Sequence, residues 1–321
     1  MKLNQGLIEA LGNYLIKLSL KQIPLDTQYL PRQASPEALA NYLIFMVSID
    51  HRTGRGFKAK MEGRFYKGSD LLWKLGEIKW RKQPSFFTAT EMLKINMGEV
   101  VSWLTAPFSG KVVKKPGLRA LLLRDTAKWL MKLFKGEAFK LIEAAQGSCM
   151  RLVELLRPFK AFSDPVAKKP YLLIKFLERG GLFQVEDPEN LHVPVDNHLT
   201  RLALRIGLIE LSRSDLETLR SGKVDLSFDV MLRMQTRSAF KRVADIAEVK
   251  PSILDDLLWL TGRTICLRQG AACVHKHKSP RKLQALVKGK WHRCPFEEVC
   301  EGLHDPAKRT LKEPEVTTWW Y

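Results

Sequence analysis

Four of the five cysteines of this chain lie in its last fifth, and their spacing constrains the fold more than any other feature. Cys266 and Cys273 are separated by six residues, and Cys294 and Cys300 by five. Thiolates bind soft metals, so this grouping predicts a single metal site. Structural zinc sites usually pair cysteines about two to four residues apart. The wider spacing therefore favours an iron-sulfur cluster, with zinc or four unliganded cysteines as the alternatives.

The sequence around these cysteines resembles one branch of the helix-hairpin-helix DNA glycosylases. In the endonuclease III and adenine glycosylase branch, a helix ending in His-Gly-Arg-x-x-Cys is followed by cysteines after six, two and five residues. Here Thr261-Gly262-Arg263-Thr264-Ile265-Cys266 is similar to that entry, with the six and the five present. The middle spacing departs from the pattern, because twenty residues, Val274 to Arg293, replace two. The resemblance implies that the four cysteines hold a [4Fe-4S] cluster.

The inserted segment is strongly basic, with seven Lys and Arg, three His and no acidic residue. The whole chain has a net charge of +19 and a pI near 9.8, so its positive potential attracts phosphates. A basic protein without a nucleic-acid partner remains the alternative for charge alone, and a solvated loop for the insertion. Because the cluster would hold both ends of the insertion, we expect DNA contacts from Lys276, Lys278, Arg281, Lys282, Lys288 and Lys290.

A second informative segment runs from His192 to His198 and contains Val193-Pro194-Val195-Asp196. Proline disfavours helix in the residue before it, so Asp196 should stand at the start of a helix. An Asp there is most often only an N-cap. The segment is similar to the Val-Asp and Pro-Val-Asp segments of endonuclease III and of the archaeal 8-oxoguanine glycosylases, which implies that Asp196 is the catalytic carboxylate. Such a group stabilises the positive charge that develops on the sugar when the base leaves.

The resemblance also places a nucleophilic lysine upstream of Asp196. The glycine-rich hairpin of endonuclease III is missing, and Asp164-Pro165-Val166-Ala167-Lys168 is similar instead to the Asp-Pro-x-x-Lys run of the archaeal 8-oxoguanine glycosylases. The match points to Lys168, and Lys169 stays open because it precedes Pro170, a favoured first helical residue. Burial near a helix N-terminus lowers a lysine pKa and frees the amine to attack the sugar. Phosphate contact by both lysines is the alternative.

The turn after the expected helix Asn41 to Ser48 is a candidate DNA contact. Endonuclease III-like enzymes carry a Ser-Ala-Gln turn at the equivalent point, whose side chain fills the gap left by an extruded base. The resemblance makes Ile49, Asp50 and His51 wedge candidates, with Arg52 beside them, although a polar turn needs no function. We expect core packing, rather than base stacking, for Trp73, Trp80, Phe86 and Phe87.

Apolar residues recur at helical spacing along almost the whole chain and strand signals are few, so the predicted fold class is all-α. The resemblance implies a two-lobed helix-hairpin-helix glycosylase fold, with a six-helix barrel lobe over residues 30–180. A second lobe would comprise residues 1–29 and 181–303, with the cluster loop at 266–300, followed by a tail at 304–321. Helices are expected over Leu7–Leu20, Pro36–Ser48, Ser69–Leu75, Thr88–Leu104, Arg124–Leu133, Phe139–Leu156, Pro170–Leu177, His198–Ile209 and Ile253–Leu260.

The function that the resemblance implies is base excision by a DNA glycosylase, with or without AP-lyase activity through a lysine Schiff base. The expected partner is double-stranded DNA with a damaged or mismatched base. The alternative is a non-catalytic iron-sulfur protein of the same fold that binds DNA or RNA, which the missing hairpin favours. We find no secretory pattern and no long uncharged apolar segment. We therefore expect a monomer in the reducing cytoplasm or nucleoid, without membrane attachment and with Cys149 as a buried free thiol.

Overall fold

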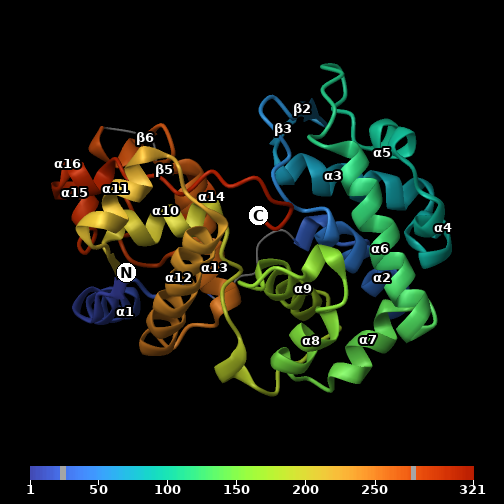
Figure 1. Cartoon of the computed structure of the whole chain (residues 1–321), viewed down its shortest axis with the longest axis horizontal. Coiled ribbons are helices and arrows are strands. Elements are labelled where there is room, and N and C mark those ends of the chain that lie inside the picture. The colour runs from blue at the N-terminus through green and yellow to red at the C-terminus, as the bar shows by residue number, and fades with distance from the viewer. Residues whose placement is uncertain (22–26, 276–279) are drawn as a thin grey trace. The chain divides into compact units, whose positions relative to one another are not determined.

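The described part of the chain is mostly helical with a few short strands, which confirms the predicted all-α fold class (Figure 1). A computed structural model describes residues 1–21, 27–275 and 280–321. It divides into two compact units: unit 1 comprises Met1–Leu25 and His192–Thr317, and unit 2 comprises Asp26–Leu191 and Thr318–Tyr321. None of the helices in the described part of the chain combines the length and the apolar character that crossing a membrane requires.

Unit 2 is built around α2, whose residues Tyr42, Phe45 and Met46 are fully buried. α2 packs against α6, α7 and α9, so it is covered on several sides. Its elements are α2 (Pro36–Ser48), β2 (Lys58–Met61), β3 (Arg64–Lys67), α3 (Ser69–Lys82), α4 (Ala89–Lys94), α5 (Met97–Trp103), α6 (Pro116–Phe134), α7 (Ala138–Ala145), α8 (Cys149–Leu156) and α9 (Lys168–Arg179), with 3-10 turns at Thr27–Tyr29, Pro84–Phe87, Lys160–Phe162 and Pro188–Asn190.

Two of the expected helices are each divided into two. The helix expected over Thr88–Leu104 breaks between α4 and α5, because Asn96 caps α5 and Glu99 caps back onto the Asn96 backbone. The helix expected over Phe139–Leu156 breaks at Gln146, whose φ of 48° is left-handed. The apolar spacing continues across both breaks, so periodicity alone does not reveal them.

The basic segment after Arg52 forms a β-hairpin, which the few strand signals of the sequence did not predict. In the antiparallel ladder Lys60 lies opposite Phe65, and Met61 opposite Arg64. The turn residues Glu62 and Gly63 have φ values of 49° and 72°. Two successive positive φ values suit the right-handed twist of a two-residue hairpin, and this explains the glycine.

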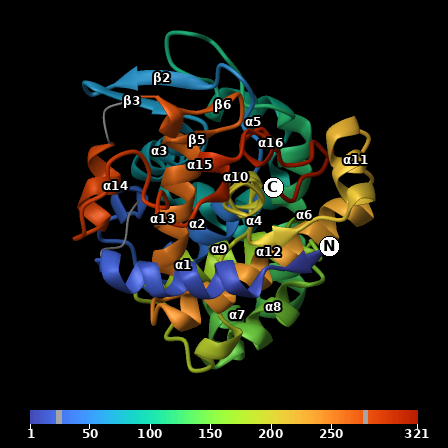
Figure 2. The same ribbon diagram turned by 90° about the vertical axis from the view of Figure 1, so that its left-hand side faces the viewer.

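In unit 1, helix α1 packs against helix α12 (Figure 2). Neither α11 nor α12 was among the expected helices. The buried face of α12 includes Asp229 and Arg233, which form an ion pair at 3.0 Å, and these charges interrupt the apolar pattern. The elements are β1 (Lys2–Leu3), α1 (Gln5–Leu18), α10 (Asn197–Ile206), β4 (Ile209–Glu210), α11 (Arg213–Ser221), α12 (Leu226–Ile246), α13 (Pro251–Thr264), β5 (Cys266–Leu267), β6 (Gly270–Ala271), α14 (Arg281–Leu286), α15 (Glu301–His304) and α16 (Pro306–Arg309), with a 3-10 turn at Ala272–Val274.

The boundary between the units differs from the expected one at residue 180. Residues 181–191 belong to unit 2, where Phe183 and Leu191 are buried. Asp187 fixes this segment, because its Oδ1 accepts the Cys149 N–H at 2.6 Å and its Oδ2 accepts the Ser148 hydroxyl at 2.8 Å. The expected separate tail is also divided, since residues 304–317 belong to unit 1 and Thr318–Tyr321 to unit 2.

Candidate active site and cysteine site

Asp196 is the N-cap of α10, as the sequence predicted. Its Oδ1 accepts the N–H groups of His198 at 2.7 Å and Leu199 at 3.0 Å. Val193 and Val195 before it are buried, whereas Asp196 itself is half-buried. Both bonds end on one oxygen, which leaves Oδ2 with no hydrogen bond among the described residues. Asp196 therefore caps α10 through one carboxylate oxygen, and its other oxygen takes no part in the cap.

Two arginines join α10 to the cysteine segment within unit 1. The Arg201 guanidinium donates to the carbonyls of Cys266 at 2.8 Å and Gly262 at 2.7 Å, and pairs with Glu313 at 2.8 Å. One helical turn on, Arg205 donates to the Leu267 carbonyl at 2.8 Å, and its Nη1 lies 3.4 Å from the Cys266 Sγ. The helix that begins at Asp196 is thus fixed to the segment that carries the predicted metal ligands.

The four cysteines of the C-terminal frame gather in unit 1. Burial raises the pKa of Cys294 well above its ordinary value, and Cys300, Cys266 and Cys273 raise it further. Burial, Cys266 and Cys273 together raise the pKa of Cys300 to about 12. The four thiols are therefore close enough to repel one another as anions. Cys149 lies in unit 2, where it is free and fully buried, as expected.

This donor set has the chemistry of a site for a soft metal. Deprotonating four clustered thiols is costly unless a bound cation compensates their charge. Among the described His, Cys, Asp and Glu side chains, no group of three or more could hold a metal ion as it stands. Four thiol sulfurs are a donor set that either an iron-sulfur cluster or a zinc ion can use.

Part of the basic insertion lies within the described residues, whereas Lys276 and Lys278 lie outside them. Leu283 and Leu286 of α14 are buried. The chain is tied to the end of α1, because the Lys21 N–H donates to the Leu286 carbonyl at 2.8 Å and the Gly289 N–H to the Leu18 carbonyl at 2.9 Å. This packing leaves exposed the predicted DNA contacts Arg281, Lys282, Lys288 and Lys290.

In unit 2, α9 begins with the two candidate lysines. The carboxylate of Asp164 accepts the backbone N–H of Lys168 at 3.1 Å and that of Lys169 at 3.5 Å, and so caps the helix from within the core. Burial raises the pKa of Asp164, while these two N–H groups act in the opposite direction. Ala167 connects cap and helix with a left-handed φ of 56°.

The amines of both lysines reach the turn that follows α2. Lys168 Nζ donates to the Asp50 carbonyl at 3.0 Å. Lys169 Nζ donates to the Ser48 carbonyl at 2.6 Å and lies 3.4 Å from His51 Nδ1. Burial lowers the pKa of Lys169 well below its ordinary value, and the charges of Lys168 and Arg119 lower it further. The fold thus brings together two candidate sets that are more than a hundred residues apart.

Arg119 completes this site and was not found from the sequence. Its guanidinium is fully buried and donates to the carbonyls of His51 at 2.8 Å, Arg52 at 3.1 Å and Lys114 at 3.1 Å, and also to that of Ile49. It therefore fixes the turn that accepts the lysine amines. A single arginine within the apolar pattern of α6 gives no sequence signal for such a role.

The turn itself changes the set of DNA-contact candidates. Ile49 is fully buried, and His51 is buried. Burial also lowers the pKa of His51, with help from the charge of Arg119, so its ring is neutral. Neither side chain can enter DNA from these positions, whereas Asp50 and Arg52 remain half-exposed. Trp73 belongs to the core, as expected, and its Nε1 donates to Asp50 Oδ2 at 3.0 Å.

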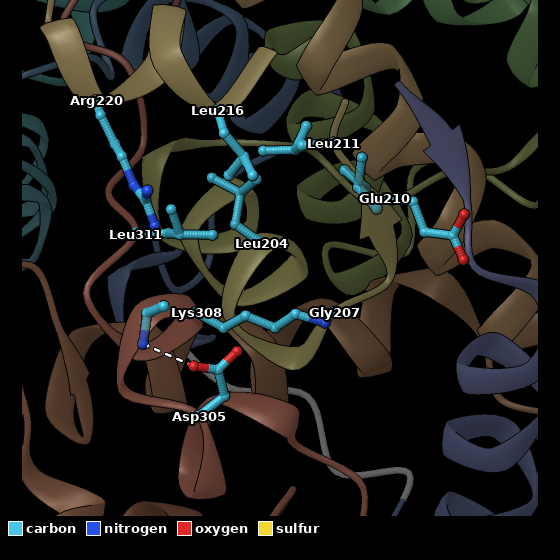
Figure 3. Close-up of a pocket in the computed structure, with 11 residues that line it drawn as sticks. Leu204, Gly207, Glu210, Leu211, Leu216, Arg220, Asp305, Lys308 and Leu311 are labelled. Carbon is cyan, nitrogen blue, oxygen red and sulfur yellow. Dashed lines mark hydrogen bonds between the residues drawn. The ribbon is translucent and has the colours of Figure 1, made fainter. Parts of the chain in front are cut away.

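A separate cavity of about 260 Å³ lies in unit 1, away from Asp196, beside the C-terminal end of α10 (Figure 3). Leu204, Leu216 and Leu311 supply apolar walls, and Arg220, Asp305 and Lys308 supply polar ones. None of these residues was singled out from the sequence. The cavity does not include any of the predicted catalytic residues or cysteines.

Comparisons with known proteins find a likeness among solved structures alone. No protein-family model matches the chain, and no curated protein matches it. A solved structure of an 8-oxoguanine DNA glycosylase from Pyrobaculum aerophilum, complexed with 8-oxoguanosine, is similar with a TM-score of 0.36 and 18% identity. The alignment covers 88% of this chain and 94% of that one. A likeness of this size assigns no activity to the chain.

Proposed function

We propose that this protein is a DNA glycosylase of base excision repair. The observation that carries the proposal is the pair of lysine amines at the start of α9. Both donate to backbone carbonyls, and neither forms an ion pair with a carboxylate among the described residues. Burial lowers the pKa of the Lys169 amine in this pair, and a neutral amine is the form that attacks a sugar carbon.

The two lysines differ in their access to solvent. The side chain of Lys169 is fully buried. Lys168 is 7% exposed, and its amine bonds the carbonyl of the half-exposed Asp50. We therefore propose that Lys168 forms the covalent bond to the sugar, which gives the enzyme its AP-lyase activity. Lys169 then supports the turn through Ser48.

Asp196 is proposed to stabilise the positive charge on the sugar as the base leaves. Its free Oδ2 is the atom that would do so, while Oδ1 holds the helix N-terminus. A fixed carboxylate acts without reorganising at the moment of reaction, which is the main source of electrostatic catalysis. The same group can assist proton transfer to or from water.

Cys266, Cys273, Cys294 and Cys300 are proposed to hold a [4Fe-4S] cluster. The support is their gathering in unit 1 and their spacing in the sequence. The cluster would cross-link β5 to the segment after α14 and so stabilise unit 1. Arg201 and Arg205 then hold α10, and with it Asp196, against this segment.

The proposal is tested by incubating the protein with duplex oligonucleotides that carry damaged or mismatched bases. Release of a base is measured, and borohydride is used to trap a Schiff base. Asp196→Asn should reduce base release by orders of magnitude while leaving DNA affinity nearly unchanged. The matched control is Asp225→Asn, because Asp225 caps α12 in the same unit through a bond of 2.7 Å to the Phe228 N–H.

The lysine variants decide which amine reacts. Lys168→Gln should abolish the trapped adduct, whereas Lys169→Gln should retain it. The reverse result would assign the bond to Lys169. If the parent releases no base from any substrate yet binds DNA, the protein is a non-catalytic binding protein and the catalytic proposal fails.

A further inference from the structure

A second basic surface in unit 2 is formed by the β2–β3 hairpin and the loop between α5 and α6. Residues 52–67 contain six Lys and Arg and one acidic residue, Glu62, which pairs with Lys74 at 3.2 Å. Residues 105–115 contain three lysines and no acidic residue. The two segments together thus carry nine cationic side chains against one carboxylate. None of their side chains beyond Arg52 belongs to the site described above, although the Lys114 carbonyl accepts a hydrogen bond from Arg119 there.

The hairpin has one apolar face and one cationic face. Ala59 and Tyr66 are buried against the unit, whereas Lys58, Lys60 and Phe65 point to the other side of the ladder. Phe65 is 61% exposed between these cations. A phenylalanine so exposed costs free energy in water unless a partner covers it in the functional state.

The neighbouring loop repeats the combination of exposed aromatic ring and exposed cations. Phe108 is 98% exposed, and Lys111, Lys114 and Lys115 are exposed after it. The loop is tied to the base of the hairpin, because the Lys114 N–H donates to the Thr53 carbonyl at 2.9 Å. Both views show the loop beside the hairpin (Figures 1 and 2). The two segments therefore form one continuous surface.

This surface is also continuous with the lysine site. Arg119 donates to the carbonyls of Arg52 at 3.1 Å and Lys114 at 3.1 Å, which begin the hairpin segment and end the loop. The same guanidinium holds the His51 carbonyl at 2.8 Å, beside the amine of Lys169. A polyanion lying on the hairpin and the loop would therefore reach the turn that accepts the lysine amines.

We propose that the hairpin and the α5–α6 loop bind the backbone of duplex DNA, with Phe65 and Phe108 in contact with a groove. The charge excess favours phosphates, and a two-stranded ribbon has the width of the major groove. Exposed aromatic side chains can then make apolar contacts with bases in the major groove, such as with the thymine methyl group. The inference rests on the proposed function for the choice of DNA, and it adds a surface that fixes the duplex next to the lysine site.

The test measures the affinity for duplex DNA as a function of salt. The variant Lys58→Ala/Lys60→Ala/Lys67→Ala, which removes the cations of the face that carries Phe65, should lower the slope of log K against log salt by about 2 to 3, at roughly 0.9 for each phosphate that the variant no longer neutralises. Phe65→Ala should lower the affinity several-fold and leave the slope unchanged, because an apolar side chain releases no counterion. The control variant Lys82→Ala/Lys128→Ala/Lys132→Ala removes the same charge from exposed positions of α3 and α6.

The outcomes separate the surface from a general effect of charge. Equal decreases of the slope in the hairpin and control variants, or no decrease in either, would overturn the proposal. A second result would also overturn the proposal. If the hairpin variant keeps its DNA affinity but no longer binds vesicles of phosphatidylcholine and phosphatidylserine, the surface binds a membrane instead of DNA. Base release at saturating enzyme should be unchanged in the hairpin variant. A parent protein that releases no base refutes the glycosylase proposal but leaves the binding test intact.

Discussion

Replacing Arg119 tests whether one buried guanidinium holds the turn that receives the lysine amines. Arg119→Met removes hydrogen bonds to four carbonyls, of which those of Ile49 and His51 belong to buried residues. An unsatisfied buried acceptor costs about 1–3 kcal/mol, so these two alone cost about 2–6 kcal/mol. Removing a desolvated charge offsets part of this cost, and we expect the free energy of unfolding to fall by about 3 kcal/mol.

Charge and hydrogen bonding are separated by a second variant. Burial lowers the pKa of Arg119 to about 10, so the guanidinium is charged at neutral pH and depresses the pKa of His51. Arg119→Met should therefore raise the pKa of His51. Arg119→Lys keeps a positive charge but cannot reach four carbonyls, so it should lower stability without a similar rise in the pKa.

Unfolding in urea is followed by tryptophan fluorescence, which reports mainly on unit 2 because six of the eight tryptophans, all except Trp259 and Trp291, lie there. The pKa of His51 is followed by NMR titration of its ring protons. One unsatisfied buried acceptor costs at least about 1 kcal/mol. If Arg119→Met loses less than this in the free energy of unfolding, the guanidinium does not hold the turn. If the pKa of His51 rises equally in both variants, the charge of Arg119 is not what lowers it.

Four further predictions follow from the described residues. The purified protein should be brown and contain about four iron per chain, and zinc without iron or sulfide after anaerobic purification would contradict the cluster. Arg205→Met should destabilise unit 1 and loosen the cluster, seen as faster release of iron to a chelator, because it removes the hydrogen bonds to Cys266 and Leu267. Alanine at Arg281, Lys282, Lys288 and Lys290 should reduce DNA affinity for all sequences alike and flatten the salt dependence, whereas an unchanged slope assigns these exposed residues to solvent. Burial lowers the pKa of His192 to about 4, so the unfolded chain binds a proton more tightly than the folded one. The free energy of unfolding should therefore fall as the pH drops from about 6.5 towards 4. His192→Asn should reduce this fall, as measured by urea titration at each pH.

The sequence alone determined the features that depend on local order along the chain. The helical periodicity predicted the fold class, and Pro194 with Asp196 predicted the start of α10 and its cap, because a proline and a capping carboxylate act on residues one to three positions away. The cysteine spacing and the charge of the insertion are likewise read directly from the sequence, without knowledge of the fold. The β2–β3 hairpin and the divided helices were missed, because each depends on a short turn or cap that periodicity does not record.

Which distant residues meet depends on how the helices pack, and the sequence did not reveal it. The tertiary structure brought Lys168 and Lys169 to the turn at Ser48–His51, and it placed Arg119 among four carbonyls, although the three segments are separated by dozens of residues. It also removed Ile49 and His51 from the DNA-contact candidates by burying them. Hydrogen bonds and burial between remote segments depend on how helices pack in three dimensions. An arginine that satisfies buried carbonyls looks in the sequence like any other charged residue on a helix.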